Sequence, residues 1–85
     1  MNLMGGIREL DLHGCTYEEG LKKTEKAVKE ANNSIYRIRV IHGFHGGNSL
    51  KGMLREEFSY GRNEKVLRVV GGNNEGITEL VLREY

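Results

Sequence analysis

The chain has 85 residues, of which 38% are hydrophobic and 29% charged, and its 13 Lys and Arg against 12 Asp and Glu give a net charge of +1. This length fits one small domain with a single core, and the charge balance excludes a strong overall attraction to nucleic acid or an anionic membrane. Cys15 is the only cysteine, which excludes an intramolecular disulfide, and no apolar stretch approaches the roughly 20 residues that span a bilayer. We therefore expect a cytoplasmic protein without a membrane partner, with a short N-terminal extension over residues 1–6 and one domain over residues 7–85.

The first half of the chain predicts a strand, a helix and a second strand. Apolar and polar residues alternate over residues 7–12, which is typical of a half-buried strand. Thr16 and Glu19 have the spacing of a capping box, so we expect a helix over residues 17–31. The β-branched residues of the segment 35–41 predict the second strand.

The second half predicts a helix and two further strands. Asn48 or Ser49 is the expected cap of a helix whose apolar residues recur at helical spacing. These apolar residues are Leu50, Met53, Leu54 and Phe58. Strands are expected over residues 65–70 and 77–83, and the Gly- and Asn-rich loop between them favours an antiparallel hairpin. The order βαβαββ predicts an α/β two-layer sandwich with two helices and a mixed four-stranded sheet, in which the first strands are parallel.

Two segments share the plan of a strand that ends in His-Gly. They are Leu-Asp-Leu-His-Gly at residues 10–14 and Arg-Val-Ile-His-Gly at residues 39–43. Parallel strands place both corners at the carboxyl edge of the sheet, where open α/β sheets bind ligands. We therefore expect His13 and His42 at one edge, with Asp11 on the same side of its strand as His13.

The loop after the second corner has the composition of a phosphate-binding loop. It is rich in glycine and leads into the N-terminus of a helix, where backbone N–H groups and the helix dipole attract anions. The candidate phosphate-binding residues are Gly14, Gly43, His45, Gly46, Gly47, Asn48, Lys51 and Arg55.

Asp11, His13 and His42 are the candidate catalytic residues. Phosphodiester cleavage needs a base, an acid and positive or N–H groups for the charge on the phosphate, and histidine can act as acid or base near neutral pH. Asp11 could orient a histidine or hold a divalent cation such as Mg²⁺ or Mn²⁺, although one carboxylate with histidines is an incomplete site for such an ion. No organic cofactor is expected. The structural alternative is that each His-Gly is a simple turn and that Asp11 caps a neighbouring backbone N–H.

These residues resemble the motifs of the Smr (small MutS-related) domain family. The resemblance begins with residues 10–14 and continues with Val-Ile-His-Gly at 40–43 and its glycine loop, Leu-Arg at 54–55, Gly-Ile-Thr at 76–78 and Leu-Val-Leu at 80–82. It implies a fold like the C-terminal domain of bacterial translation initiation factor three. It also implies nucleic-acid binding and, as in several members, endonuclease activity by DNA nicking or RNA cleavage.

The resemblance assigns residues by position. Asp11 and His13 match the first motif, and His42 with Gly43 matches the second. The later glycine of the second motif corresponds to one of the pair at 46–47. The family pattern His-Gly-x-Gly-x-Gly is about one residue shorter than the loop of this chain, so the individual phosphate contacts of the family are not carried over.

The residues leave three functions open. The first is a stand-alone Smr-like domain that nicks or cleaves DNA or RNA at the edge of Asp11, His13 and His42. The second is a non-catalytic module that binds nucleic acid with the same edge. The third is an interaction module or a binder of small phosphates without a nucleic-acid role. The sequence does not distinguish DNA from RNA, and it does not indicate the metal or the oligomeric state.

Overall fold

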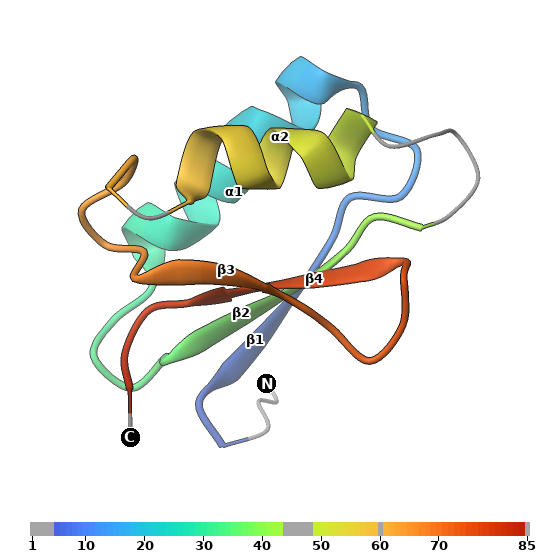
Figure 1. Cartoon of the computed structure of the whole chain (residues 1–85). Helices are drawn as coiled ribbons and strands as arrows, with labels where there is room; N and C mark the ends of the chain where they lie inside the picture. The colour runs from blue at the N-terminus through green and yellow to red at the C-terminus, as the bar shows by residue number, and fades with distance from the viewer. Residues whose placement is uncertain (1–4, 44–48, 60, 85) are drawn as a thin grey trace.

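Two helices cover one face of a four-stranded sheet and leave the other face open, as Figure 1 shows for the computed structural model of the chain. The structure describes residues 5–43, 49–59 and 61–84. The elements are β1 (Ile7–Asp11), α1 (Tyr17–Glu30), β2 (Arg37–Ile41), α2 (Ser49–Phe58), β3 (Arg68–Gly71) and β4 (Ile77–Val81). The predicted α/β sandwich with the order βαβαββ is confirmed.

The sheet has the strand order β1-β2-β4-β3. β1 and β2 are parallel, with Ile7 opposite Arg37 and Asp11 opposite Ile41. β4 is antiparallel to both of its neighbours and lies between β2 and β3, and Ile77 at its start pairs with Ile41. The beginning of β4 therefore lies at the same edge of the sheet as the ends of β1 and β2.

The start of α1 is fixed by the predicted capping box. The hydroxyl of Thr16 accepts a hydrogen bond from the backbone N–H of Glu19 at 3.1 Å, and the Glu19 carboxylate accepts one from the N–H of Thr16 at 3.0 Å. These two bonds satisfy N–H groups that would have no partner inside the helix. They start α1 three residues after the first His-Gly corner, with Tyr17 as its first residue.

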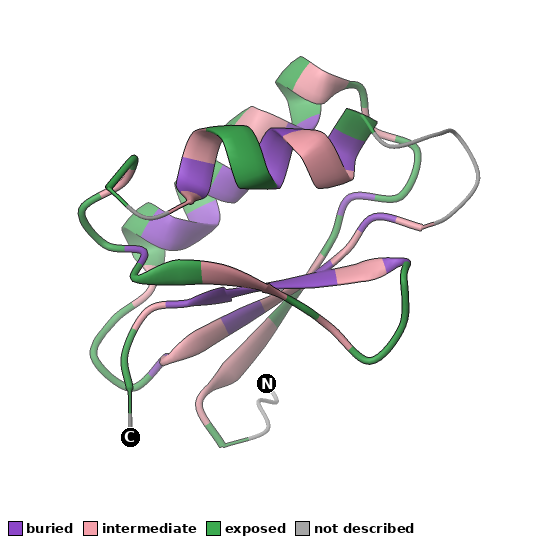
Figure 2. Cartoon of the chain, in the orientation of Figure 1, coloured by how far each residue is buried: buried purple, intermediate pink, exposed green. Residues whose placement is uncertain are grey.

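The core lies between the helices and the covered face of the sheet (Figure 2). It consists of Leu12, Ala27, Val28, Ile35, Ile38, Val40, Leu50, Met53, Leu54, Phe58, Val66 and Leu80. All four apolar residues predicted for the second helix are therefore buried. Along β2 the burial alternates, because Ile38 and Val40 face the helices while Arg37 and Arg39 lie on the open face. No helix among the described residues has the length and apolar character needed to cross a membrane.

The third strand begins later than the sequence predicts. It starts at Arg68 and not at Lys65, because Lys65 and Val66 make tertiary contacts. The Lys65 ammonium donates to the carbonyls of Lys29 and Ala31 at the end of α1, at 3.2 Å each. Val66 has a buried side chain and follows a turn that places it in the core. A cation at a helix C-terminus is favourable, which explains why Lys65 contacts the end of α1 and does not extend the strand.

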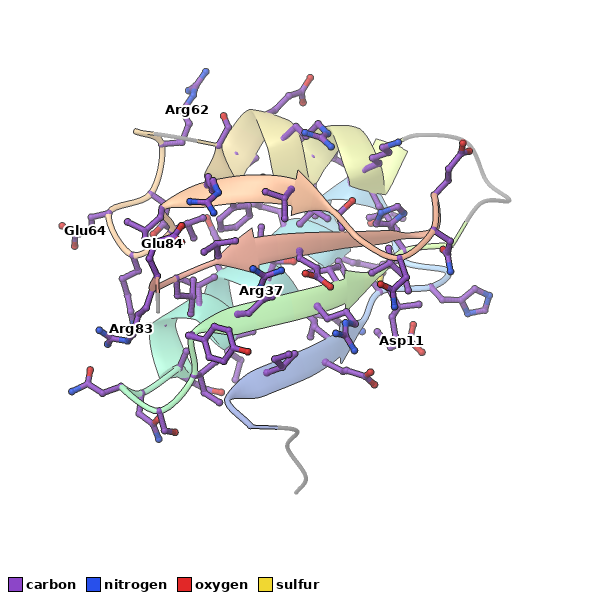
Figure 3. The ribbon with its side chains drawn as sticks, turned by 60° about the horizontal axis from the view of Figure 1, so that its bottom comes forward. Asp11, Arg37, Arg62, Glu64, Arg83 and Glu84 are labelled. Atoms are coloured by element: carbon purple, nitrogen blue, oxygen red, sulfur yellow. The ribbon has the colours of Figure 1, made fainter. Side chains whose placement is uncertain are left out.

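The open face of the sheet carries a buried carboxylate between two arginines. Glu79 on β4 is 5% exposed, and its oxygens accept hydrogen bonds from Arg37 at 2.5 Å and from Arg39 at 3.1 Å. Figure 3 shows Arg37 lying over this face. Burial raises the pKa of Glu79, but the hydrogen bonds and charges of the two arginines outweigh burial and lower this pKa below the ordinary value. Glu79 therefore offsets one of the two guanidinium charges, and exposed Glu9, 3.6 Å from Arg39, lies near the other.

We predict that Glu79→Gln destabilises the fold by about 2 kcal/mol, because it leaves two partly buried arginines without a counter-charge. Glu9→Gln is the matched control. Glu9 is largely exposed, it is 3.6 Å from Arg39, and such pairs contribute about 0.5 kcal/mol or less. Urea unfolding at pH 7 and low salt measures both changes in the free energy of unfolding. An equal loss in the two variants would show that the buried pair has no special role in stability.

Candidate nucleic-acid interface

The parallel pairing of β1 and β2 brings the two His-Gly corners to one edge, as the sequence predicts. The ladder continues one bond past the strands, since the N–H of Leu12 donates to the carbonyl of Ile41 at 2.8 Å. The corner glycines have matching backbone geometry, with φ of +83° at Gly14 and +82° at Gly43. Both values lie in the left-handed region that favours glycine. The glycine of each His-Gly is therefore required by the way in which each strand leaves the sheet.

Asp11 and His13 lie at the surface of this edge. Oδ1 of Asp11 accepts a hydrogen bond from the backbone N–H of His13 at 2.9 Å, which is the capping contact that the structural alternative expects. Among the described residues the other carboxylate oxygen has no hydrogen-bond partner. The His13 ring is exposed, and Figure 3 shows Asp11 at the end of β1 that is remote from Arg83 and Arg62. The first corner thus presents a carboxylate oxygen and an imidazole to solvent.

His42 has a different environment from His13. It is 8% exposed, and both of its ring nitrogens have partners. Nε2 lies 2.8 Å from the hydroxyl of Thr78, and Nδ1 lies 3.1 Å from the carbonyl of Gly43. The structure therefore buries the His42 ring on the helix side of the sheet, toward which Val40 also points, whereas Asp11 has the orientation of Glu9 toward the open face.

The surroundings of His42 favour its neutral form. Burial lowers the pKa of His42 below its ordinary value, the Gly43 carbonyl opposes this shift in part, and the positive charge of Lys51 lowers the pKa further. Leu50 in the first turn of α2 and Leu12 before the first corner both lie against Gly20 of α1, which places that turn near the edge.

The start of β4 completes the edge. The carbonyl of Gly76 accepts hydrogen bonds from the backbone N–H groups of His42 at 2.9 Å and Gly43 at 3.0 Å, and Thr78 is fully buried. Sequence reasoning assigned no role to Thr78. Thr78 belongs to the Gly-Ile-Thr segment that resembles the Smr family, but a buried hydroxyl needs a partner, and only the strand order identifies that partner.

The remaining candidates lie on or before α2. Lys51 is partly exposed and Arg55 is exposed, and a spacing of four residues places both on one side of the helix. The other candidates, His45 and residues 46–48, lie outside the described residues, so their contacts with phosphate stay predictions.

The described residues do not assemble a metal site by themselves. In the ranges 5–43, 49–59 and 61–84, no three His, Cys, Asp or Glu side chains form a group that could hold a metal ion. Asp11 has one oxygen available, and the nitrogens of His42 are engaged. A Mg²⁺ or Mn²⁺ ion here would need water or substrate oxygens as most of its ligands. Its presence stays a prediction.

Comparison with known proteins agrees with this geometry. Residues 10–83 match the model of the Smr domain family. Over 69 residues, or 80% of the chain, the sequence is 39% identical to Endonuclease MutS2 of Exiguobacterium sibiricum, and the match covers 8% of that relative. The crystal structure of the Smr domain of Thermus thermophilus MutS2 superimposes with a TM-score of 0.78 at 28% identity, covering 91% of this chain and 99% of that one. The chain thus spans a small part of the length of Endonuclease MutS2 and nearly the whole of the Smr domain structure.

We predict that His42 makes the fold less stable in mild acid. Its pKa is lowered in the folded state, so as pH falls through the ordinary histidine range the unfolded chain takes up a proton that the folded chain does not. Stability is fully present above that range and declines below it, by at most about 1.4 kcal/mol per pH unit for one proton. Urea midpoints from pH 8 to pH 5 should fall more steeply for the wild type than for His42→Gln. His13→Gln is the matched control and should keep the wild-type slope, whereas equal slopes in all three proteins would contradict the prediction.

Proposed function

The chain belongs to the Smr domain family, and on this premise we propose that it binds nucleic acid at the edge formed by β1, β2 and the start of β4 and cleaves a phosphodiester bond there. The observation that carries the proposal is the meeting of two His-Gly corners at one edge, where Leu12 and Leu50 of the first turn of α2 both lie against Gly20. The relative with 39% identity is named an endonuclease, which supports the same activity.

The proposed binding surface uses local positive charge. Lys51 and Arg55 lie on one side of α2, and Lys51 is in its first turn. The arginines of the open face contribute less, because Arg37 and Arg39 are engaged by Glu79, and Arg39 also pairs with Glu9. With a net charge of only +1, binding depends on a few phosphate contacts and should weaken steeply with salt.

The proposed cleavage is hydrolysis at one phosphate. A water oxygen attacks phosphorus while the bond from phosphorus to the leaving sugar oxygen breaks, a base takes the proton of the water and an acid protonates the leaving oxygen. Among the three candidate catalytic residues, the exposed imidazole of His13 is the group in position to exchange a proton with solvent and substrate. Asp11 holds the backbone of His13 and presents a second oxygen to the same space. His42 is buried, and both of its ring nitrogens have partners.

A non-catalytic binding module is the second candidate function. The engagement of both His42 nitrogens favours it, because this leaves one described imidazole free at the edge. Both candidates use the same surface and predict the same binding. They differ only in whether a strand is cut.

For binding, we predict that the double variant Lys51→Gln/Arg55→Gln lowers affinity for a short oligonucleotide. Each lost phosphate contact should reduce the slope of log K against log salt by about 1, or about 2 for the pair. Lys22→Gln/Lys26→Gln is the matched control, because it removes the same charge from an exposed part of α1. Fluorescence anisotropy across a salt series measures both slopes. Equal losses in the two double variants would mean that only net charge matters and that α2 is not the interface.

For cleavage, we predict that the purified chain cuts supercoiled plasmid or end-labelled single-stranded RNA. His13→Ala should lower the rate about 10²–10⁴-fold, the usual contribution of a general acid or base. Glu9→Gln serves as the control on the same strand, and parallel reactions in Mg²⁺, Mn²⁺ and EDTA test the predicted metal. Undiminished cleavage by His13→Ala would contradict the role of His13. Absence of cleavage by the wild type, with oligonucleotide binding retained, would assign the chain to the binding-module function.

A further inference from the structure

We infer that Thr78 is a positioning residue of the proposed nucleic-acid site: its hydroxyl donates to Nε2 of His42, which fixes the His42 proton on Nδ1 and holds the second corner through Gly43. The consequence for nucleic acid rests on the proposed function. The hydrogen bonds that define the pair are geometric and can be tested without substrate.

The contacts of His42 determine the positions of the hydrogens. The Gly43 carbonyl can only accept, so the facing Nδ1 at 3.1 Å must carry a hydrogen. A neutral imidazole has a single N–H, which leaves a lone pair on Nε2 for the Thr78 hydroxyl at 2.8 Å. Protonating Nε2 would place N–H against the hydrogen of Thr78 and would force that hydroxyl to rotate. Lys51 is the charged group near the ring, and its positive charge also opposes a second proton.

Thr78 differs from the other fully buried threonine among the described residues. The hydroxyl of Thr24 donates to the Gly20 carbonyl one turn earlier in α1, at 2.7 Å, so that contact stays within one helix. The hydroxyl of Thr78 instead connects β4 to a titratable ring that follows β2. Thr24 is therefore a suitable control for Thr78, because its hydroxyl bonds only the backbone of its own helix, whereas the hydroxyl of Thr78 bonds the side chain of His42.

The pair fixes the point at which the chain leaves the sheet for the glycine-rich loop. The Gly43 carbonyl accepts a hydrogen bond from Nδ1 of His42. The backbone N–H groups of His42 and Gly43 both donate to the carbonyl of Gly76. The ring and two backbone bonds thus clamp the corner between β2 and β4. With Nε2 occupied, His42 acts on substrate through this clamp, and proton exchange at the edge falls to His13.

The test begins with the wild-type chain labelled with ¹⁵N. Long-range ¹H–¹⁵N NMR spectra at pH 7 should show a protonated Nδ1 and an unprotonated Nε2 for His42. Thr78→Val should shift the Nε2 resonance of His42, because it removes the hydroxyl that hydrogen-bonds this nitrogen and keeps the shape of the side chain, and Thr78→Ser should restore the wild-type shift. Thr24→Val is the matched control and should keep the wild-type signature. A protonated Nε2 in the wild type would overturn the inference whatever the variants do, including a Thr78→Val chain that fails to fold.

The second readout is the function of the same proteins. Relative to Thr24→Val, Thr78→Val should lower oligonucleotide affinity or cleavage about tenfold, the effect of one lost buried hydrogen bond, and Thr78→Ser should recover most of it. Wild-type function in Thr78→Val with an altered His42 signature would overturn the positioning role while leaving the proposed function in place. A wild-type chain that shows the expected His42 signature but neither binds nor cleaves nucleic acid would overturn the proposed function. It would also overturn the role of His42 and Thr78 in that function, while the hydrogen bond between them would still stand.

Discussion

The parallel ladder between β1 and β2 determines that both His-Gly corners lie at one edge of the sheet. Because Asp11 is opposite Ile41, the two strands end at the same level, and each then turns away through a glycine with positive φ. A parallel pair requires a crossover connection, and the capping box starts α1 directly after the first corner to provide it. The same edge receives the beginning of β4, whose Gly76 carbonyl binds the second corner. The candidate site is therefore a direct consequence of strand register.

Two copies of one local motif have different roles in this fold. At the first corner the imidazole is exposed beside a carboxylate, and at the second it is buried between a hydroxyl and a carbonyl. The cause is the strand order: β1 is an edge strand, while β2 has β4 beside it to supply Gly76 and Thr78. An exposed imidazole suits proton exchange with a substrate, whereas a buried and doubly bonded one suits the positioning of a loop. The edge thus combines one exposed imidazole with one buried imidazole.

Much of this architecture could be predicted from the sequence. The alternation of apolar residues, the spacing from Thr16 to Glu19 and the repeated His-Gly predict the element order, the start of α1 and the shared edge. The insertion of β4 between β2 and β3 could not be predicted, because an antiparallel strand can pair on either side and packing decides. The burial of His42 and the contact with Thr78 both depend on that insertion. The late start of β3 likewise depends on a tertiary contact, the capping of α1 by Lys65.

The central claim is that the edge of the two corners, and not the open face of the sheet, receives nucleic acid. The most direct measurement is a titration of the ¹⁵N-labelled chain with a short oligonucleotide, followed by backbone amide shifts. The account predicts that residues 11–14, Gly43 and the first turns of α2 shift together and saturate at one affinity. Shifts confined to Arg37, Arg39 and β3, with an unchanged edge, would contradict it.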